Sequence, residues 1–386
     1  MTRRLGKISL AVSGLALAGS AMAQDAAAPP ALSPALAGPL TYNPDPINFE
    51  MPLLGKVYVT GIGSGLVGAQ SNSVPGTAKT FGDVSNAQII VQKPEGVFQF
   101  LVQAGLYNHG TLGTPLLRST TYTANTHGVV PQAWIKLAPS ANFNIQAGIL
   151  PTLIGLETPF TFQNMNIDRG ILWGQENVLT RGVQANATLG KLALSVALTD
   201  GFFSGKYNWL SGAATYSFDS SNILSVIVGG ALSKNTKSAF VTPVLQNNSF
   251  IANVIYTYTS GPLLLQPYFQ YTKIPSLAFL GTTKTETWSG ALLARYTISE
   301  NFSLPVRFEY VDSTGSAAQG SASPLYGAGS NAFTFTITPT YTFSRFFIRP
   351  EFSVVKASKI TLGSAFGSDG RATSQVRGRL EFGVMF

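Results

Sequence analysis

The last eleven residues, 376–386, alternate between two kinds of side chain, and this constrains the fold more than any other feature of the chain. One set carries no charge and consists of Val376, Gly378, Leu380, Phe382, Val384 and Phe386. The other set begins with Arg377, Arg379 and Glu381. Because successive side chains of a β-strand point to opposite sides of the sheet, the pattern predicts a strand with one apolar and one charged face. Strands of soluble β-sandwiches also alternate, so the pattern alone does not exclude a soluble β-sandwich.

The hydrophobic residues are spread along the chain instead of gathered in long runs. They make up 45% of the sequence, and charged residues make up 11%, against roughly 25% in a typical soluble protein. After the first few dozen residues, no run reaches the ~18 apolar residues that a membrane helix needs. Scarce charge without long apolar runs is typical of a transmembrane β-barrel. The strand that ends at Phe386 also resembles the closing strand of Gram-negative outer-membrane barrels, which commonly ends on an aromatic residue that the barrel-assembly machinery recognises.

The first 23 residues have the three parts of a secretory signal peptide. A basic start precedes an apolar stretch, 8–19, that is too short to span a bilayer. The small residues of Ala21-Met22-Ala23 form a cleavage site. We therefore expect export and a mature chain that begins at Gln24.

The segment 24–53 is rich in Ala and Pro, which predicts an unstructured periplasmic leader, with a short plug or a partner-binding arm as alternatives. The barrel is then expected over residues 54–386. The chain has no Cys, which suits a barrel because closed backbone hydrogen bonding holds it together. Without the three bases of the signal peptide the formal charge falls from +8 to +5. The remaining bases are scattered over many expected strands, so a nucleic-acid partner is excluded.

Short connections alternate with long ones from Leu54 to the end of the chain. The short ones are expected at 93–96, 138–142, 190–191, 218–222, 260–262, 298–301 and 343–345. The long, polar, Gly-rich ones are expected at about 66–82, 108–128, 151–177, 201–206, 234–248, 274–285, 312–330 and 358–373. Seven hairpins, an opening strand near 56–64 and the closing strand make about sixteen antiparallel strands, with short periplasmic turns and long extracellular loops. The predicted fold is all-β, a barrel wide enough for a water-filled channel.

Three segments in the middle of the chain resemble a known family. They are Gln146–Glu157, which contains Gly-x-x-x-Thr-x-x-Gly-x-Glu, then Asn166–Gly174, and Thr180–Val183. Together they are similar to the family called putative β-barrel porins, type two, in which such a strand leads into a long loop. The resemblance implies an outer-membrane barrel that acts as a porin. It implies no particular solute, and it leaves open whether three barrels associate as a homotrimer.

Sites for metals, catalysis and nucleotides have little support in the sequence. The two His residues, His109 and His127, stand in one expected outer loop without a metal-binding spacing, so we expect them to face solvent. No Gly-x-Ser-x-Gly stretch accompanies His109 to form a catalytic set. The Gly-rich stretch 61–65 leads into a loop and not into a helix, so it does not predict a phosphate site. We expect no enzymatic activity and no cofactor.

The long connection 151–177 contains many apolar residues for an external loop. They are Leu153, Ile154, Phe160, Phe162, Ile171, Leu172 and Trp173, beside the charged Glu157, Asp168, Arg169 and Glu176. Since apolar side chains gain nothing from contact with water, we expect this loop to fold into the lumen and pack on the wall. The alternatives are a cap on the rim or a contact with a neighbouring protomer.

Charged side chains on the expected lumen faces predict one strand register. The units Arg349-Pro350-Glu351 and Arg379-Leu380-Glu381 would place Arg349 opposite Glu381 and Glu351 opposite Arg379, whereas a shift by two residues would oppose like charges. Two lumen cations, Arg295 and Arg377, would then be unmatched, which predicts a weak anion preference. The candidate pore-lining residues are Glu157, Asp168, Arg169, Arg295, Arg307, Glu309, Arg349, Glu351, Arg377, Arg379 and Glu381.

These observations favour an outer-membrane porin for passive diffusion of small hydrophilic solutes and ions. Two alternatives stay open: a substrate-specific channel, and a non-conducting structural or surface-recognition barrel. The expected partners are the lipid of the bacterial outer membrane, the barrel-assembly machinery through the strand that ends at Phe386, and the solutes themselves.

Overall fold

The computed structural model describes residues 46–239, 241 and 243–386. The expected signal peptide, 1–23, and the expected leader up to residue 45 lie outside these described residues. Within the described part of the chain, no helix is both long and apolar enough to cross a membrane.

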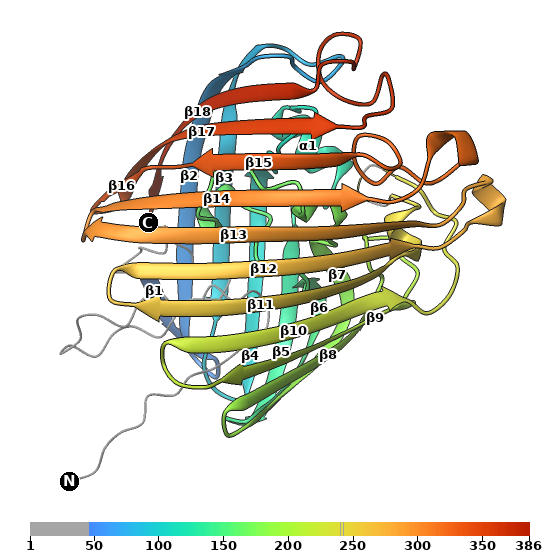
Figure 1. Ribbon diagram of the computed structural model, residues 1–386. Coiled ribbons are helices and arrows are strands. Elements are labelled where there is room, and N and C mark those ends of the chain that lie inside the picture. The colour runs from blue at the N-terminus through green and yellow to red at the C-terminus, as the bar shows by residue number, and fades with distance from the viewer. Residues whose placement is uncertain (1–45, 240, 242) are drawn as a thin grey trace.

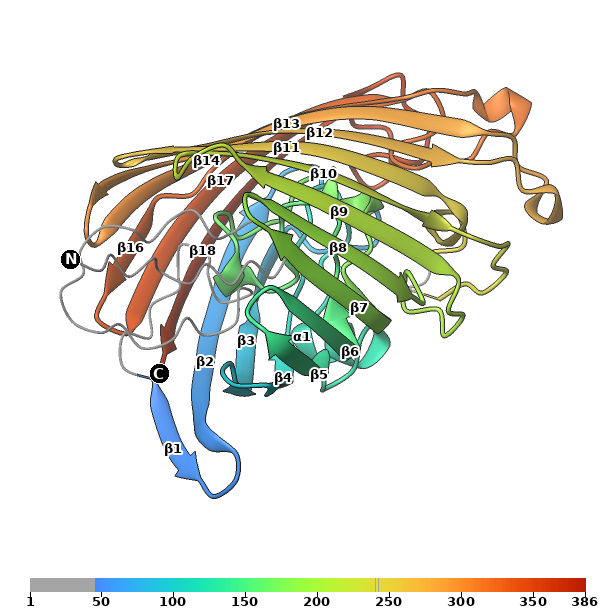
Figure 2. The same cartoon turned by 90° about the horizontal axis from the view of Figure 1, so that it is seen from below.

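Antiparallel β-strands dominate the chain, and they form a single sheet. The strands are β1 (Ile47–Met51), β2 (Gly55–Gln70), β3 (Thr80–Lys93), β4 (Phe98–Tyr107), β5 (Gln132–Ser140), β6 (Phe143–Pro151), β7 (Leu179–Leu189), β8 (Leu192–Thr199), β9 (Trp209–Ser217), β10 (Asn222–Ala231), β11 (Phe250–Ser260), β12 (Leu263–Ile274), β13 (Thr285–Ser299), β14 (Phe302–Ser313), β15 (Asn331–Ile337), β16 (Thr340–Phe343), β17 (Phe346–Ser358) and β18 (Ser374–Met385). From β2 onward each strand pairs with its neighbours in sequence, except that β15 and β16 lie end to end between β14 and β17, and Figure 2 shows the strands running around a ring.

The pairing of β18 with β2 closes the ring. It runs from Arg377 opposite Gln70 to Met385 opposite Ile62. The strands β15 and β16 both pair with β14 and β17, so they are one spanning strand that is interrupted at 338–339, where Pro339 has no N–H to donate. With β1 outside the ring, sixteen strands form the closed barrel, as predicted.

The strand β1 lies in the last part of the segment expected to be an unstructured leader. It pairs with the start of β2, from Ile47 opposite Val59 to Met51 opposite Gly55. The carbonyl of Phe386 accepts the N–H of Gly61, 2.6 Å away, on the same edge of β2. The backbone groups that β18 leaves unpaired at this edge are therefore taken by β1.

The two faces of each strand differ as the sequence predicts. On β15, Phe333 is 46% exposed on the outside, while Thr334 and Thr336 are fully buried on the inside. Aromatic residues beside the tight turns are exposed on the outer surface, among them Phe143, Phe218 and Tyr341. An outward apolar face that meets lipid and an inward polar face follow from the same alternation.

Short turns and long loops lie at opposite ends of the barrel. In Figure 1 the strands at the front, β11 to β14, have their tight turns at the left and their long loops at the right. The helical turns all fall in the long loops: α1 (Ser119–Asn125), η2 (Thr161–Gln163), η3 (Trp173–Gln175), η4 (Gln246–Asn248), η5 (Ala278–Leu280) and η6 (Ala317–Gln319). The helical turns of the described residues are thus gathered at one end of the barrel, the end with the long loops.

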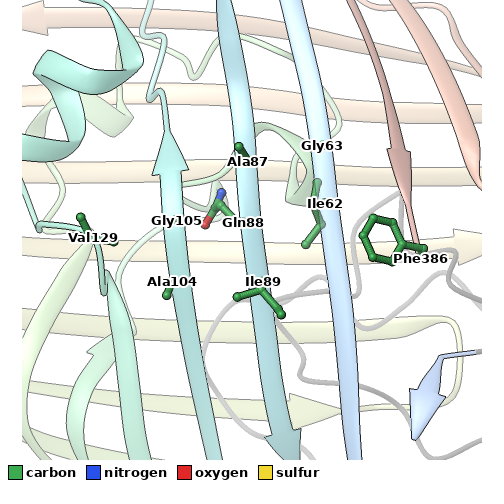
Figure 3. Close-up of a pocket in the computed structure, with 9 residues that line it drawn as sticks. All are labelled: Ile62, Gly63, Ala87, Gln88, Ile89, Ala104, Gly105, Val129 and Phe386. Carbon is green, nitrogen blue, oxygen red and sulfur yellow. The ribbon is translucent and has the colours of Figure 1, made fainter.

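The outer wall carries a shallow depression of about 540 Å³ across β2, β3 and β4 (Figure 3). Small residues such as Gly63, Ala87 and Ala104 form its floor, and the Phe386 ring stands beside it. Because exposed Ile89 shares the outward face of β3 with Ala87, the depression faces lipid and does not belong to the lumen.

Candidate functional site

The connection from β6 to β7, which we call the inner loop (residues 152–178), lies inside the barrel. Most of its residues are buried, and Phe160, Ile167, Asp168 and Arg169 are fully so. Its apolar side chains pack as expected from the sequence. Ile154, Ile171 and Leu172 join a cluster with Trp209 and Ile227 from β9 and β10, and Phe160 and Phe162 join a second cluster with Leu101 and Phe347 from the wall.

The lumen faces of β14 to β18 carry seven buried charged side chains, and we call this surface the charged wall. They are Arg307, Glu309, Arg349, Glu351, Arg377, Arg379 and Glu381. The alternation of these strands directs all seven inward, as the sequence predicts. Each of the seven contacts the inner loop, so this wall holds the loop in place and is shielded by it from the rest of the lumen.

The pair Arg349 and Glu381 holds the first helical turn of the loop. The guanidinium donates to the carbonyl oxygens of Asn164 and Thr161, both at 2.9 Å, and forms an ion pair with Glu381. The Glu381 carboxylate accepts the Thr161 hydroxyl at 2.6 Å. Thr161 therefore contacts both members of this pair.

Two wall carboxylates accept backbone N–H groups of the loop. Glu351 accepts those of Ile167 and Asp168, the second at 3.0 Å. Glu309 accepts those of Ile171 and Leu172, at 3.1 and 3.2 Å. Gly170 permits this approach, because a Cβ at that position would lie 1.9 Å from Glu309 Oε1. These hydrogen bonds depend on where the loop backbone runs and not on which side chains the loop carries.

The loop residue Asp168 lies between two wall arginines. Its carboxylate is 3.0 Å from Arg377 Nη1 and 2.9 Å from Arg379 Nη2. The prediction that Arg377 is an unmatched cation is therefore wrong, since the loop supplies its partner. Arg307 acts similarly: it forms an ion pair with Glu157 and donates to the Asp168 carbonyl oxygen at 2.8 Å.

The strand register predicted from charge is present. Arg349 stands opposite Glu381 and Glu351 stands opposite Arg379. Only the first of these two facing pairs forms an ion pair among the described residues, because the loop draws Arg379 to Asp168 and Glu351 to its backbone. The register is thus as predicted, while half of its charge pairing is redirected to the inner loop.

The remaining two candidate residues lie elsewhere. Arg169 is inside the loop, where it donates to the carbonyl oxygens of Ile167, Pro159 and Asn108 and lies over the Trp173 ring. It stabilises the loop's own fold. Arg295 is on β13, partly exposed on the lumen-facing side, and it has no ion pair among residues 46–239, 241 and 243–386.

Burial changes the protonation of the loop acids. It raises the pKa of Glu157 to about 7, although Arg307 opposes the rise. It raises the pKa of Glu176 to about 8, against the hydrogen bond from Tyr268. Burial alone would also raise the pKa of Asp168, but Arg379 and Arg377 outweigh it and hold that pKa below its usual range. Near neutral pH both Glu157 and Glu176 are therefore partly protonated, which reduces the negative charge of the loop.

Another part of the lumen, separated from the charged wall by β2, is lined by amides, and we call it the amide wall. It consists of lumen-facing side chains of β3 to β7, namely Asn86, Gln88, Gln103, Gln132, Asn144, Gln146, Gln184 and Asn186. Several pair with each other, such as Gln103 with Gln88 at 2.6 Å and Gln184 with Asn186 at 2.8 Å. Asn86 reaches the loop, donating to the Thr161 hydroxyl at 2.6 Å. No motif in the sequence marks these residues, although the alternation along β3 to β7 indicates that they face inward.

The two histidines are buried, which corrects the expectation that they face solvent. His109 packs against Tyr107, Tyr122, Phe160 and Trp173, and its ring centroid is 6.0 Å from that of His127. Burial, with Arg169 nearby, lowers the pKa of His109, and burial lowers that of His127 to about 3. Two neutral imidazoles without a third ligand in the described part of the chain do not make a metal site.

Comparison with known proteins agrees with this architecture. Salmonella typhi OmpF, solved in complex with daunomycin, superposes with a TM-score of 0.58 at 12% identity, over 88% of this chain and 100% of that chain. The outer-membrane channel DcaP of Acinetobacter baumannii gives 0.57 at 13%, over 88% and 99%. OmpT, an outer-membrane protein of Vibrio cholerae, gives 0.55 at 9%, over 86% and 97%.

At these identities the solved structures share the fold alone with this chain. None of the curated proteins matches the chain. The sequence pattern of one family, described as "putative beta-barrel porin-2, OmpL-like", matches residues 57–386, which include the whole barrel and the inner loop. The chain therefore belongs to this family of outer-membrane β-barrel porins.

Proposed function

We propose that this protein is a channel for the passive diffusion of small hydrophilic solutes and ions across the outer membrane. The inner loop is the main support for this proposal, because it is a long loop anchored inside a barrel whose inward faces are polar. A loop fixed across the lumen narrows the path, and selectivity in such a channel depends on which side chains line the remaining space. Family and fold support a channel over an enzyme.

Single-channel recording of the refolded protein in planar bilayers, under KCl gradients, tests this function. Discrete conductance steps are expected. A correctly folded barrel that carries no current would instead support the non-conducting structural or surface-recognition barrel. Saturable block of the current by one class of solute would favour the substrate-specific channel.

The export route and the partners follow from the same proposal. Removal of residues 1–23 should leave Gln24 as the first residue, and the intact mass of protein from outer membranes measures this; a start beyond Pro30 would contradict it. The barrel-assembly machinery should recognise the strand that ends at Phe386, so deletion of Phe386 should reduce insertion. Native mass spectrometry distinguishes a single barrel from a homotrimer.

A further inference from the structure

Four basic side chains gather at the long-loop end of the barrel, and we call them the basic cluster. They come from the start of β7, the β8–β9 loop (200–208) and the β10–β11 loop (232–249), and they are Arg181, Lys206, Lys234 and Lys237. Two of them converge above Gly205: Lys237 Nζ is 3.3 Å and Arg181 Nη2 is 3.5 Å from the point that a Cβ on Gly205 would occupy. Lys206 follows Gly205 in the chain, and its Nζ donates to the Lys234 carbonyl oxygen. The four cations therefore border one small space that Gly205 leaves open.

Hydrogen bonds hold the two loops that carry the cluster against each other. The Asn208 side chain donates to the Ser233 hydroxyl at 3.1 Å, and the Leu232 N–H donates to the Asn208 carbonyl oxygen at 2.7 Å. Asp200 accepts the N–H of Gly205 at 3.0 Å and Nε of Arg181 at 2.7 Å. The positions of the cations are thus fixed by the folded loops.

The cluster has more positive than negative charge. Asp200 compensates Arg181, and the side chain of this acid is fully buried. Lys206, Lys234 and Lys237 are exposed and have no ion pair among residues 46–239, 241 and 243–386. Like charges held together repel one another, and an anion that bonds several of them at once relieves the repulsion. A phosphate monoester suits this role, because it carries up to about two negative charges and offers three acceptor oxygens.

The cluster stands beyond an apolar surface on the outside of the barrel. Arg181 shares the outward face of β7 with exposed Val183. Exposed Leu232 follows the end of β10, two residues before Lys234. The outward faces of β8 and β9 add the exposed side chains of Leu198 and Leu210. Because outward apolar side chains of a barrel meet acyl chains, cations at the end of this surface lie at the level of the lipid headgroups.

We infer that the basic cluster binds the phosphate headgroup of a membrane lipid whose acyl chains lie along the outer faces of β7 to β10. The phosphate occupies the space above Gly205, within reach of Arg181 and Lys237. With the long loops outside the cell, the lipid belongs to the outer leaflet. The site is on the outside of the barrel, so neither the inference nor its test depends on conduction through the lumen.

Binding of two lipids with the same acyl chains tests this inference: dioleoyl phosphatidic acid and dioleoyl phosphatidylcholine. The affinity of each fluorescently labelled lipid is measured for the protein refolded in detergent micelles. Phosphatidic acid presents a phosphate monoester, whereas choline neutralises the phosphate of the other lipid, so we expect phosphatidic acid to bind more tightly. The double substitution Lys206→Gln with Lys237→Gln should weaken its binding roughly 30-fold, at about 1 kcal/mol for each lysine. Binding of phosphatidylcholine should not change.

The matched control removes two exposed lysines from the short-turn end of the barrel, Lys56→Gln with Lys191→Gln. It has the same net charge as the cluster variant and should bind phosphatidic acid like the unaltered protein. Equal affinity of the unaltered protein for the two lipids would overturn the inference, and so would undiminished binding in the cluster variant or an equal loss in both double variants. Inorganic phosphate at millimolar concentration should not displace the lipid; complete displacement would assign the cluster to soluble anions instead.

Discussion

The charged wall and the amide wall line one lumen on either side of β2, yet they contact the inner loop differently. Each of the seven lumen-facing charged side chains of β14 to β18 contacts the loop through an ion pair or a hydrogen bond, as Arg349 does to Thr161 and Asn164. The amide wall pairs mainly with itself, as in Gln103 with Gln88, and leaves Gln132 unpaired beside the loop. The comparison indicates that charge serves here to anchor the inner loop, whereas the amides bond mainly to one another.

The difference between the two walls bears on ion selectivity. Charges that are buried and compensated in the charged wall do not act on ions in the open lumen. The loop acid Asp168 pairs with Arg377 and Arg379, so these charges hold the loop and compensate one another. The charged wall should therefore determine whether the lumen is narrow, and the amide wall should determine which solutes pass.

The substitution Asp168→Ala tests most directly whether the charged wall anchors the inner loop. It leaves Arg377 and Arg379 without their loop partner, and breaking a buried ion pair costs about 3–5 kcal/mol. We expect release of the loop, with a several-fold rise in conductance and trypsin cleavage after Arg169, the one basic residue among 152–178. Fragment masses and single-channel currents measure the effect.

The matched control comes from the amide wall. Gln184 is buried to the same extent and bonds Asn186, so Gln184→Leu should weaken the barrel without freeing the loop. Trypsin cleavage after Arg169 in the Gln184 variant, or a protease-resistant loop in folded Asp168→Ala, would show that the two walls do not differ as described.

Adding a single methyl group at Gly170 should release the inner loop to a smaller extent. In Gly170→Ala the new Cβ would lie 1.9 Å from Glu309 Oε1, which forces the loop or the carboxylate to move. Overpacking of this kind costs about 1–3 kcal/mol. The control is Gly174→Ala in the same loop, where an added Cβ meets nothing within 4 Å. Equal trypsin sensitivity of the two variants would argue against close support of the loop backbone by Glu309.

Rising pH should also loosen the loop. Glu157 and Glu176 have pKa values of about 7 and 8 when the loop is in place, above the ordinary carboxyl value. The docked loop thus binds more protons than the released loop between the ordinary carboxyl pKa of 4.5 and the raised values, so docking is strongest at acidic pH, weakens up to about pH 8 and changes little above that. Conductance should therefore increase as the pH rises to about 8 and then level off. Glu176→Gln, which keeps a partner for Tyr268, should remove the upper part of this rise; an unaltered profile would assign it to other groups.

Much of the barrel was predictable from the sequence because the patterns that determine it involve residues close together in the chain. Alternation assigned Phe333 and Thr334 to opposite faces, and short-range charge patterns placed Arg349 opposite Glu381. The partner of Arg377 was not predictable, because Asp168 is distant in sequence and reaches it only through the path of the loop. The unpaired amides of Gln132 and Gln163 carry no signal in the sequence either, since lumen amides with and without partners look alike there.

The smallest expected effect concerns Arg295, the lumen cation outside both walls. It has no ion pair among the described residues, so its charge acts on ions in the lumen, whereas that of Arg377 is compensated by Asp168. We expect a weak anion preference at low salt, which Arg295→Ser should reduce, while Lys136 on the lumen-facing side of β5 keeps part of it. The preference should fade in 1 M KCl, where the screening length falls to about 3 Å. Reversal potentials under KCl gradients measure both changes.

The control for Arg295→Ser removes the same charge from the outer face. Lys356 is exposed on β17 and points away from the lumen, so Lys356→Ser should leave the reversal potential unchanged. If the two variants shift it equally, the preference comes from the overall charge of the protein and not from a lumen site. Strong cation selectivity of the unaltered protein would mean that uncompensated loop acids reach the open lumen, and the assignment of charge to anchoring alone would then fail.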